Sequence, residues 1–381
     1  MRNLLYFLPP MAIGSPDKVS EIRYFAERCR LHLEFLSARP TTVWVQELRD
    51  FWNPIGAIVE SSADFQDVDP RVFGTLPTIF LNRDPATLPP QAFSVFHDQR
   101  ATARLAAREL IADGFRHFAY IPYRENTTWS AARERGFTEA LEADRFAAEV
   151  FHPTADGETA RVAELRDFLA KLPRPCGIFA ANDATAEAVL TAASLAGLAV
   201  PDDLAVLGVD NLTSLCEHTQ PPLSSIEPDF RRGAQLAIML LMAAVRDGRH
   251  FHGSRHRAFG DLGLVRREST PMQQREDREV REALGLIRRE ACSGLMVGRV
   301  AATFACSARH AHARFRKATG RTILQAIHAV QLERAKELIR ETDMPLKVIS
   351  DFCGFGNANS LRKFFRRETG KTMSQERAQP T

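Results

Sequence analysis

The chain has 381 residues, 45% of them hydrophobic and 25% charged, which is the composition of a globular protein with two or three domains. No apolar run approaches the 18 residues of a transmembrane helix, so membrane-spanning classes are excluded. The net charge of +3 is unevenly distributed, because residues 272–381 carry +9 and the preceding 271 residues carry −6. A basic terminal segment on an acidic body indicates nucleic-acid binding, with a merely solvated basic surface as the alternative.

The first 270 residues alternate short apolar runs with helical patterns. Strands are predicted over residues 4–8, 42–45, 55–60, 77–81, 118–121, 177–180 and 204–209. Helices are predicted over residues 17–37, 99–113, 131–143, 159–172, 184–196 and 229–246. Such alternation is typical of parallel sheets with helices on both faces, in which ligands bind at the carboxyl ends of the strands.

Residues 271–280 are polar and lack apolar periodicity, so we predict a linker there between a domain over 1–270 and a domain over 281–381. The six cysteines are scattered and form no CxxC pair, so we expect no zinc site, no metal and no cofactor. The apolar stretch over residues 3–8 is too short for a signal peptide and predicts a first buried strand. We therefore expect a cytoplasmic protein with no membrane partner.

The last hundred residues contain two helix-turn-helix patterns in tandem. The first lies around residues 300–320 and the second around 348–370, and each ends at a glycine. A long amphipathic helix is predicted between them over residues 323–341. Each such unit places one helix in a major groove, so the chain is expected to contact two successive grooves of DNA.

Five segments of the first domain, in order, resemble the effector domains of LacI-type repressors and periplasmic sugar-binding proteins. They begin at Asp98, Arg133, Cys176, Pro201 and Pro222, and their spacing matches over about residues 3–269. The resemblance implies two α/β lobes joined by three crossovers, with a small ligand in the cleft. LacI-type repressors carry their DNA-binding headpiece before this domain, whereas here we expect the DNA-binding domain at the other end.

The expected ligand contacts are polar groups near the ends of predicted strands. Sugar hydroxyls donate and accept hydrogen bonds, so a sugar site needs carboxylate, amide and guanidinium groups beside an aromatic wall. The resemblance places contacts at Arg133, at Asn182 or Asp183, and at Asp210, and Trp129 lies beside Arg133. The alternatives are a helix cap for Asn182 and Asp183, a turn for Asp210, an exposed helix position for Arg133, and core packing for Trp129.

The segment from about residue 278 to residue 377 resembles the AraC-type transcription regulators, whose pattern is two three-helix units bridged by a long helix. In the second unit Asn357 is expected to start a helix that turns its polar side to DNA. The expected DNA contacts there are Ala358, Asn359, Arg362, Lys363 and Arg366. Asparagine pairs with adenine and arginine with guanine, whereas Lys363 and Arg366 are expected to hold phosphates.

The first unit departs from the family pattern. Ser307 is the expected cap, and the expected DNA contacts are Arg309, His310, His312, Arg314 and Lys317. The family usually has arginine where Ala313 stands. Either Arg314 compensates from the neighbouring face, or this unit mainly binds the DNA backbone. Met373 and Glu376 replace the proline and aromatic residue of the family's closing motif, which predicts a loosely packed final helix.

These patterns predict an α/β sensor followed by an all-α DNA-binding domain, in a ligand-controlled transcription regulator that is not an enzyme. The union resembles xylose operon regulators, which implies a pentose such as xylose as the effector. The expected partners are operator DNA, RNA polymerase and a second copy of the chain. The alternative is a sugar-active enzyme with an accessory DNA-binding domain, but the sequence lacks a nucleotide-binding glycine loop and a G-x-S-x-G nucleophile.

Overall fold

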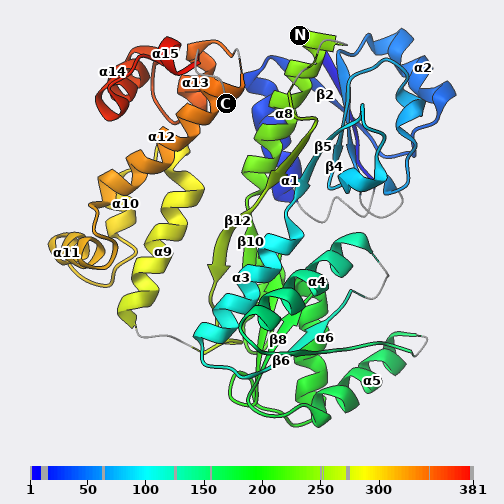
Figure 1. Cartoon of the computed structure of the whole chain (residues 1–381), viewed down its shortest axis with the longest axis vertical. Helices are drawn as coiled ribbons and strands as arrows, with labels where there is room; N and C mark the ends of the chain where they lie inside the picture. The colour runs from blue at the N-terminus through cyan, green and yellow to red at the C-terminus, as the bar shows by residue number, and fades with distance from the viewer. Residues whose placement is uncertain are drawn as a thin grey trace. The chain divides into compact units, whose positions relative to one another are not determined.

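The computed structural model describes residues 2–9, 16–61, 65–123, 127–154, 157–248, 251, 253–271, 275–342 and 344–377. The chain forms two compact units, Met1–Met272 and Gln273–Thr381 (Figure 1). Their boundary lies within the predicted linker over 271–280. Helix α9 (Arg275–Glu290) begins inside that segment, so residues 275–280 of the predicted linker are helical.

The first unit contains two six-stranded sheets. In the first sheet the strand order is β11-β5-β4-β3-β1-β2, and every pairing is parallel. Its strands are β1 (Arg2–Phe7), β2 (Leu31–Leu36), β3 (Gly56–Glu60), β4 (Thr78–Leu81), β5 (Phe93–His97) and β11 (His256–Phe259). Helices α1 (Pro16–Arg28) and α8 (Phe230–Asp247) pack together, and α8 contacts four of the strands. Helix α2 (Thr42–Trp52) buries its apolar side in a separate core cluster.

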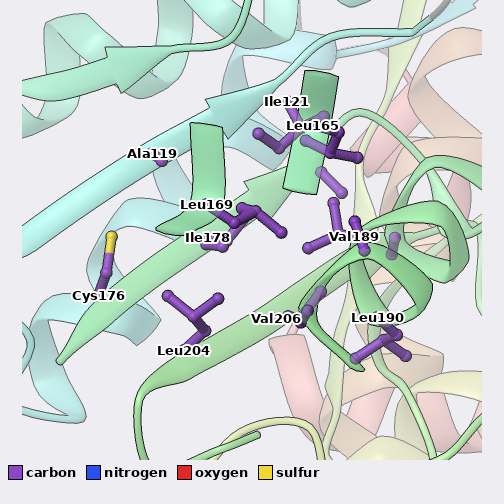
Figure 2. Close-up of a cluster of buried hydrophobic side chains, with 14 of the residues drawn as sticks. Ala119, Ile121, Leu165, Leu169, Cys176, Ile178, Val189, Leu190, Leu204 and Val206 are labelled. Carbon is purple, nitrogen blue, oxygen red and sulfur yellow. The ribbon is translucent and has the colours of Figure 1, made fainter. Parts of the chain in front are cut away.

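The second sheet has the order β12-β10-β9-β8-β6-β7, with only β12 antiparallel to its neighbour. Its strands are β6 (His117–Ile121), β7 (Ala148–Val150), β8 (Cys176–Ala180), β9 (Leu204–Val209), β10 (Ser224–Pro228) and β12 (Asp261–Val265). Helices α3 (Gln99–Ala112) and α4 (Thr128–Ala143) share one core cluster with it. Helices α5 (Glu158–Lys171) and α6 (Asp183–Leu195) share the other, where Leu169 and Val189 meet Ile178 and Val206 (Figure 2).

The chain passes between the two sheets three times. The passages run from β5 to β6, from β10 through α8 to β11, and from β11 to β12. This topology confirms the predicted two-lobed α/β class with three crossovers. The carboxyl ends of β5 and β8 therefore belong to different lobes, and ligands bind at such strand ends in this class.

Two local predictions for the first unit are wrong. Residues 42–45 were expected to be a strand because of Val43 and Val45, but they begin α2, whose cap Thr41 accepts a hydrogen bond from the Trp44 amide over 3.3 Å. The helix expected over 17–37 ends at Arg28, and residues 31–36 form β2. Apolar and polar residues alternate in Leu31–Leu36, which is the pattern of a strand. This segment forms the strand β2 because it pairs with β1.

The second unit is helical in its described part. Its helices after α9 are α10 (Val297–Ala301), α11 (Ala308–Thr319), α12 (Ile323–Glu341), α13 (Leu346–Phe352), α14 (Ala358–Thr369) and α15 (Met373–Arg377). The helix pairs α10–α11 and α13–α14 form the two predicted helix-turn-helix units. The bridging helix α12 has the predicted bounds, and Thr322 begins it with a capping box.

The final helix is better packed than the sequence predicted. Met373 and Glu376 of α15 are buried, and the Glu376 carboxylate pairs with Arg340 of α12. Arg377 donates hydrogen bonds to the carbonyl oxygens of Ile339 and Met344 over 3.3 and 3.2 Å. The ion pair between Glu376 and Arg340 therefore connects α15 to the bridging helix at the position where the family usually has an aromatic residue.

Candidate functional site

The guanidinium of Arg133 lies inside the first unit rather than on an exposed helix face. Nε donates to Gln99 Oε1 over 2.7 Å, Nη1 donates to the Ala181 carbonyl oxygen, and Nη2 lies 3.5 Å from His97 Nδ1. Its central carbon is 5.0 Å from the centroid of the Trp129 ring. Among the described residues these contacts use three of its five N–H donors, so two are available to ligand oxygens.

Trp129 is half-buried at the start of α4. Its ring centroid lies 5.1 Å from that of Tyr123, and it packs against the core cluster shared by α3 and α4. This position fits the core-packing alternative. The stack on Arg133 also fits an aromatic wall beside a polar ligand.

A buried polar network joins the first and third chain passages. His97 ends β5 and Asp261 begins β12, and His97 Nε2 lies 2.7 Å from Asp261 Oδ1. Thr102 Oγ1 donates to Asp261 Oδ2 over 2.9 Å. His97 thus faces the Arg133 guanidinium with Nδ1, and Asp261 and Thr102 with Nε2. The network therefore connects Arg133 to the segments between the lobes.

Asn182 caps helix α6. Its Oδ1 accepts hydrogen bonds from the Thr185 amide over 2.9 Å and from Thr185 Oγ1 over 2.7 Å. This geometry favours the capping alternative for the side-chain oxygen. The amide nitrogen of Asn182 takes no part in the cap.

Asp183 is only 2% exposed and supports the loop after β9. Oδ1 accepts from Ser225 Oγ over 2.6 Å, and Oδ2 accepts from the Leu212 amide over 2.8 Å and from Cys216 Sγ over 3.3 Å. Both carboxylate oxygens therefore bind the protein itself. This arrangement favours a structural role for Asp183 over the direct ligand contact expected from the sequence.

Asp210 lies in a strained turn at the carboxyl end of β9. Its φ is +109° and that of Asn211 is +49°, in a region that residues other than glycine rarely adopt. The Asp210 amide donates to the Ile226 carbonyl over 3.0 Å, and the Asn211 amide donates to Ser225 Oγ over 2.9 Å. Asp210 is half-buried and follows the last residue of β9. Strain of this kind is typical of functional positions.

Burial, together with the smaller effect of the nearby Asp210 charge, raises the pKa of Asp183 to about 7. The hydrogen bonds from Ser225, Leu212 and Cys216 oppose this shift. Asp183 therefore holds a proton near neutral pH for part of the time, which reduces the negative charge beneath Asp210.

A second polar group, which the sequence pattern did not predict, lies at the carboxyl end of the first sheet. Tyr6 of β1, Glu60 of β3 and the adjacent Ser61 are buried, and Asn82 follows β4. The sequence signal that could have identified this group is the carboxylate of Glu60, the last residue of the otherwise apolar strand Gly56–Glu60. Within the described ranges, no cluster of histidine, cysteine and acidic residues has the arrangement of a metal site.

Helix α14 has one buried and one exposed face. Asn357 Oδ1 caps it by accepting from the Ser360 amide over 2.9 Å, as expected. Leu361, Phe364 and Phe365 are buried against the second unit. The polar side exposes Asn359, Arg362, Lys363 and Arg366, with Ala358 half-buried. The five positions expected to contact DNA therefore lie together at the surface of one helix.

Helix α11 has the same arrangement with fewer base-reading groups. Ser307 caps it, and its hydroxyl lies 2.9 Å from His310 Nδ1. Ala311 and Phe315 are buried. The exposed side carries Arg309, His310, His312 and Lys317.

Arg314 points toward helix α9. Its Nη1 lies 2.5 Å from Oε2 of the buried Glu279, and its guanidinium stacks 5.5 Å from the Phe304 ring centroid. Glu279 Oε1 also accepts from the Ala305 amide, in the turn of the first helix-turn-helix unit, over 3.1 Å. This pairing favours a structural role for Arg314 over the compensating DNA contact expected from the sequence.

Comparison with known proteins gives a family for each unit. The periplasmic binding protein-like domain family matches residues 107–270, and a helix-turn-helix domain family matches residues 300–379. The xylose operon regulatory protein of Haemophilus influenzae is 28% identical over 276 residues, covering 71% of both chains. The Escherichia coli K12 protein of that name is 27% identical over 293 residues, covering 76% of this chain and 74% of its own.

Solved structures share the fold. The structure described as the xylose-binding transcription activator xylR has a TM-score of 0.57 at 22% identity, and the alignment covers 98% of this chain and 97% of that one. A LacI family transcriptional regulator from Arthrobacter sp. FB24, solved with lactose, has a TM-score of 0.57 at 25% identity. That alignment covers 71% of this chain and 99% of the other, which is the share expected for the first unit.

Proposed function

We infer that this chain, which joins a periplasmic-binding-protein-like domain to an AraC-type helix-turn-helix domain and is homologous to xylose operon regulatory proteins, is a ligand-controlled transcription regulator. The observation that carries the inference is the union, in one chain, of two lobes joined by three passages with two helix-turn-helix units. The first architecture binds small ligands and the second binds DNA.

The effector we propose is a monosaccharide, and a pentose such as xylose is the first one to test. Relatives named for xylose operons support this choice. The polar groups near the strand ends support it too, because Arg133 offers two N–H donors and Asp210 offers a carboxylate. Hydroxyl groups bind both kinds of partner. We propose Trp129, Arg133 and Asp210 as ligand contacts, with Asn182 and Asp183 behind them.

The DNA contacts we propose are the exposed residues of α14 and α11. Asn359 and Arg362 read base edges, and Lys363 and Arg366 hold phosphates. In α11, Arg309, His310, His312 and Lys317 mainly bind the backbone, because the arginine expected where Ala313 stands is missing. The second unit therefore provides most of the sequence discrimination.

Control by the ligand follows from differential affinity. A ligand that binds one arrangement of the lobes more tightly shifts the population toward that arrangement. In a homodimer this shift changes which DNA half-sites the two helix-turn-helix domains occupy together. RNA polymerase is the further partner expected of such a regulator.

A sugar-active enzyme is the alternative, since Asp183 and Asp210 are two neighbouring carboxyl groups, one with a raised pKa. Asp183, however, lies buried beneath the turn with both oxygens occupied, so it cannot transfer a proton to a bound sugar. Formation of any product from a bound sugar would establish the enzyme instead.

The test is a thermal-shift screen of the purified protein against monosaccharides, followed by operator binding with and without the sugar that stabilises it. We expect one pentose to raise the melting temperature of the wild type. The Asp210→Ala variant should lose this stabilisation while keeping its basal affinity for DNA. Unchanged sugar affinity in this variant would contradict the assignment of Asp210.

A further inference from the structure

We propose that Tyr6 and Glu60 form a ligand-binding pair in the first lobe, which holds one hydroxyl group of a neutral polyol between phenol and carboxylate. The inference rests on the proposed function. It concerns the first lobe, in which the sequence predicted no ligand contact, and it names the residues that would bind the ligand and the chemistry of that ligand. Asn82, which donates a hydrogen bond to Glu60, lies beside the pair.

Strand register places the two side chains on the same face of the sheet. Tyr6 pairs with Ile58 in the parallel ladder between β1 and β3. Side chains alternate between the faces of a strand, so Glu60, two residues beyond Ile58, shares the face of Tyr6. The Tyr6 ring packs 5.6 Å from the centroid of the Phe35 ring on the neighbouring strand. Both side chains thus lie near the carboxyl end of the sheet, where ligands bind in this class.

The hydrogen-bonding capacity of this pair is incompletely used. Tyr6 is fully buried, and its hydroxyl has no hydrogen-bond partner among the described residues. Glu60 is 2% exposed and, among the described residues, accepts one hydrogen bond, from Asn82 Nδ2 to Oε1 over 2.8 Å. Buried polar groups normally have partners, so these two incompletely bonded groups on one face of the sheet indicate that a ligand completes the set.

The chemistry of the pair selects the ligand. Burial and the neighbouring Glu60 raise the pKa of Tyr6 well above its ordinary value, so the phenol keeps its proton and can donate it. The Glu60 carboxylate only accepts. A ligand hydroxyl can accept from Tyr6 and donate to Glu60 at the same time. A phosphate or carboxylate has no proton for Glu60 and would be repelled by its charge, so the pair favours a neutral polyol over an anion.

A second buried tyrosine provides a matched control. Tyr120 of β6 also has a buried ring, but its hydroxyl donates to the Ser130 carbonyl over 2.9 Å and lies 3.1 Å from Ser130 Oγ. Removing this hydroxyl breaks a bond within the protein. Removing the Tyr6 hydroxyl removes a buried group that forms no hydrogen bond with any described residue. The two substitutions should therefore change the stability of the ligand-free protein differently.

The experiment measures melting temperature and sugar affinity of full-length Tyr6→Phe, Glu60→Gln and Tyr120→Phe. The probes are D-xylose, L-arabinose and D-ribose, followed by calorimetry, with D-ribose 5-phosphate as the anionic comparison. We expect Tyr6→Phe to bind the active sugar about tenfold more weakly, with an unchanged or raised melting temperature without sugar. Glu60→Gln should also weaken binding about tenfold, because the amide donates where a carboxylate accepted. Tyr120→Phe should melt at a lower temperature and bind sugar within about twofold of the wild type.

Three outcomes would overturn the inference. If Tyr6→Phe lowers the ligand-free melting temperature as much as Tyr120→Phe does, the hydroxyl has a structural partner. If both Tyr6→Phe and Glu60→Gln bind the active sugar with wild-type affinity, the pair does not contact it, and the proposed function still stands. If the wild type binds only the sugar phosphate, or none of the probes, the neutral-polyol chemistry is wrong, and the sugar effector of the proposed function fails with it.

Discussion

Asp183 and Asp210 are neighbouring carboxyl groups with different surroundings. Asp183 is buried and binds the amide of Leu212, whereas Asp210 is half-buried in a strained turn. The first holds the loop, and we propose the second as a ligand contact. Two carboxyl groups from different segments of the family pattern therefore have separate roles, and burial distinguishes them.

This difference predicts a pH effect on stability. The pKa of Asp183 is about 7 in the folded protein, against an ordinary value of 3.8. Between these values the folded state binds the proton more tightly than the unfolded state, so the free energy of unfolding falls as pH rises from about 4 to about 7. We expect urea unfolding of Asp183→Asn to lose this contribution, which is on the order of a few kcal/mol.

The matched control for this experiment is Asp202→Asn, which changes an exposed carboxylate in the same lobe. It should keep the wild-type slope of unfolding free energy against pH. If Asp183→Asn keeps the same slope as well, the proton binds elsewhere.

Arg362 and Lys363 are adjacent on the exposed side of α14 and make a second residue-level prediction. Arg362 Nη1 donates to Asn359 Oδ1 over 3.1 Å, so the two side chains that we propose as base contacts orient each other. Arg362→Ala should lower discrimination between the operator and single-base variants by about 1–3 kcal/mol. Lys363→Ala should weaken binding to all sequences alike and reduce the salt dependence by about one ion.

Competition binding on a selected operator and its single-base variants measures both effects. A uniform loss of affinity in Arg362→Ala would make Arg362 a phosphate contact instead. The uniform loss of affinity expected for Lys363→Ala is the reference for the loss of a phosphate contact.

Among the secondary-structure elements, helix α9 packs against the first helix-turn-helix unit instead of acting as a linker. Glu279 binds Arg314 of α11 and the Ala305 amide of the intervening turn. The polar sequence of residues 271–280 predicted a linker because periodicity detects an apolar face and cannot detect a buried ion pair. The start of α9 is thus part of the DNA-binding unit.

Removing one partner of this ion pair should destabilise the unit. Arg314→Ala removes the guanidinium that pairs with the buried Glu279 carboxylate, which should cost on the order of 3 kcal/mol. The control is Arg299→Ala, which breaks an exposed pair between α10 and Glu290 of α9. That change should cost less than about 1 kcal/mol. Chemical unfolding measures both, and a loss of base discrimination at unchanged stability in Arg314→Ala would instead establish a DNA contact.

The whole molecule consists of two compact units with separate cores. The coupling that we propose between effector and operator is therefore a property of the full chain. If the sugar changes operator affinity by a given factor, operator DNA must change sugar affinity by the same factor.

We expect that factor to lie between about 5 and 150, and it can be measured by calorimetry with sugar in the presence and absence of operator DNA. Asp210→Ala should reduce the factor to one while leaving operator binding in place. Unequal factors in the two directions would show that the measured complexes differ in composition, for example in the number of protomers bound to DNA.

The sequence by itself determined the fold class, the bridging helix α12 and the caps at Ser307 and Asn357, because periodicity and capping are local properties. It also determined the side of α14 that is exposed. Only the tertiary structure decided that Asp183 and Arg314 point inward, since their partners lie 42 and 35 residues away along the chain. The polar group around Tyr6 depends on pairing between distant strands for the same reason. Long-range contacts set burial, and burial decides which polar side chains remain available to a ligand or to DNA.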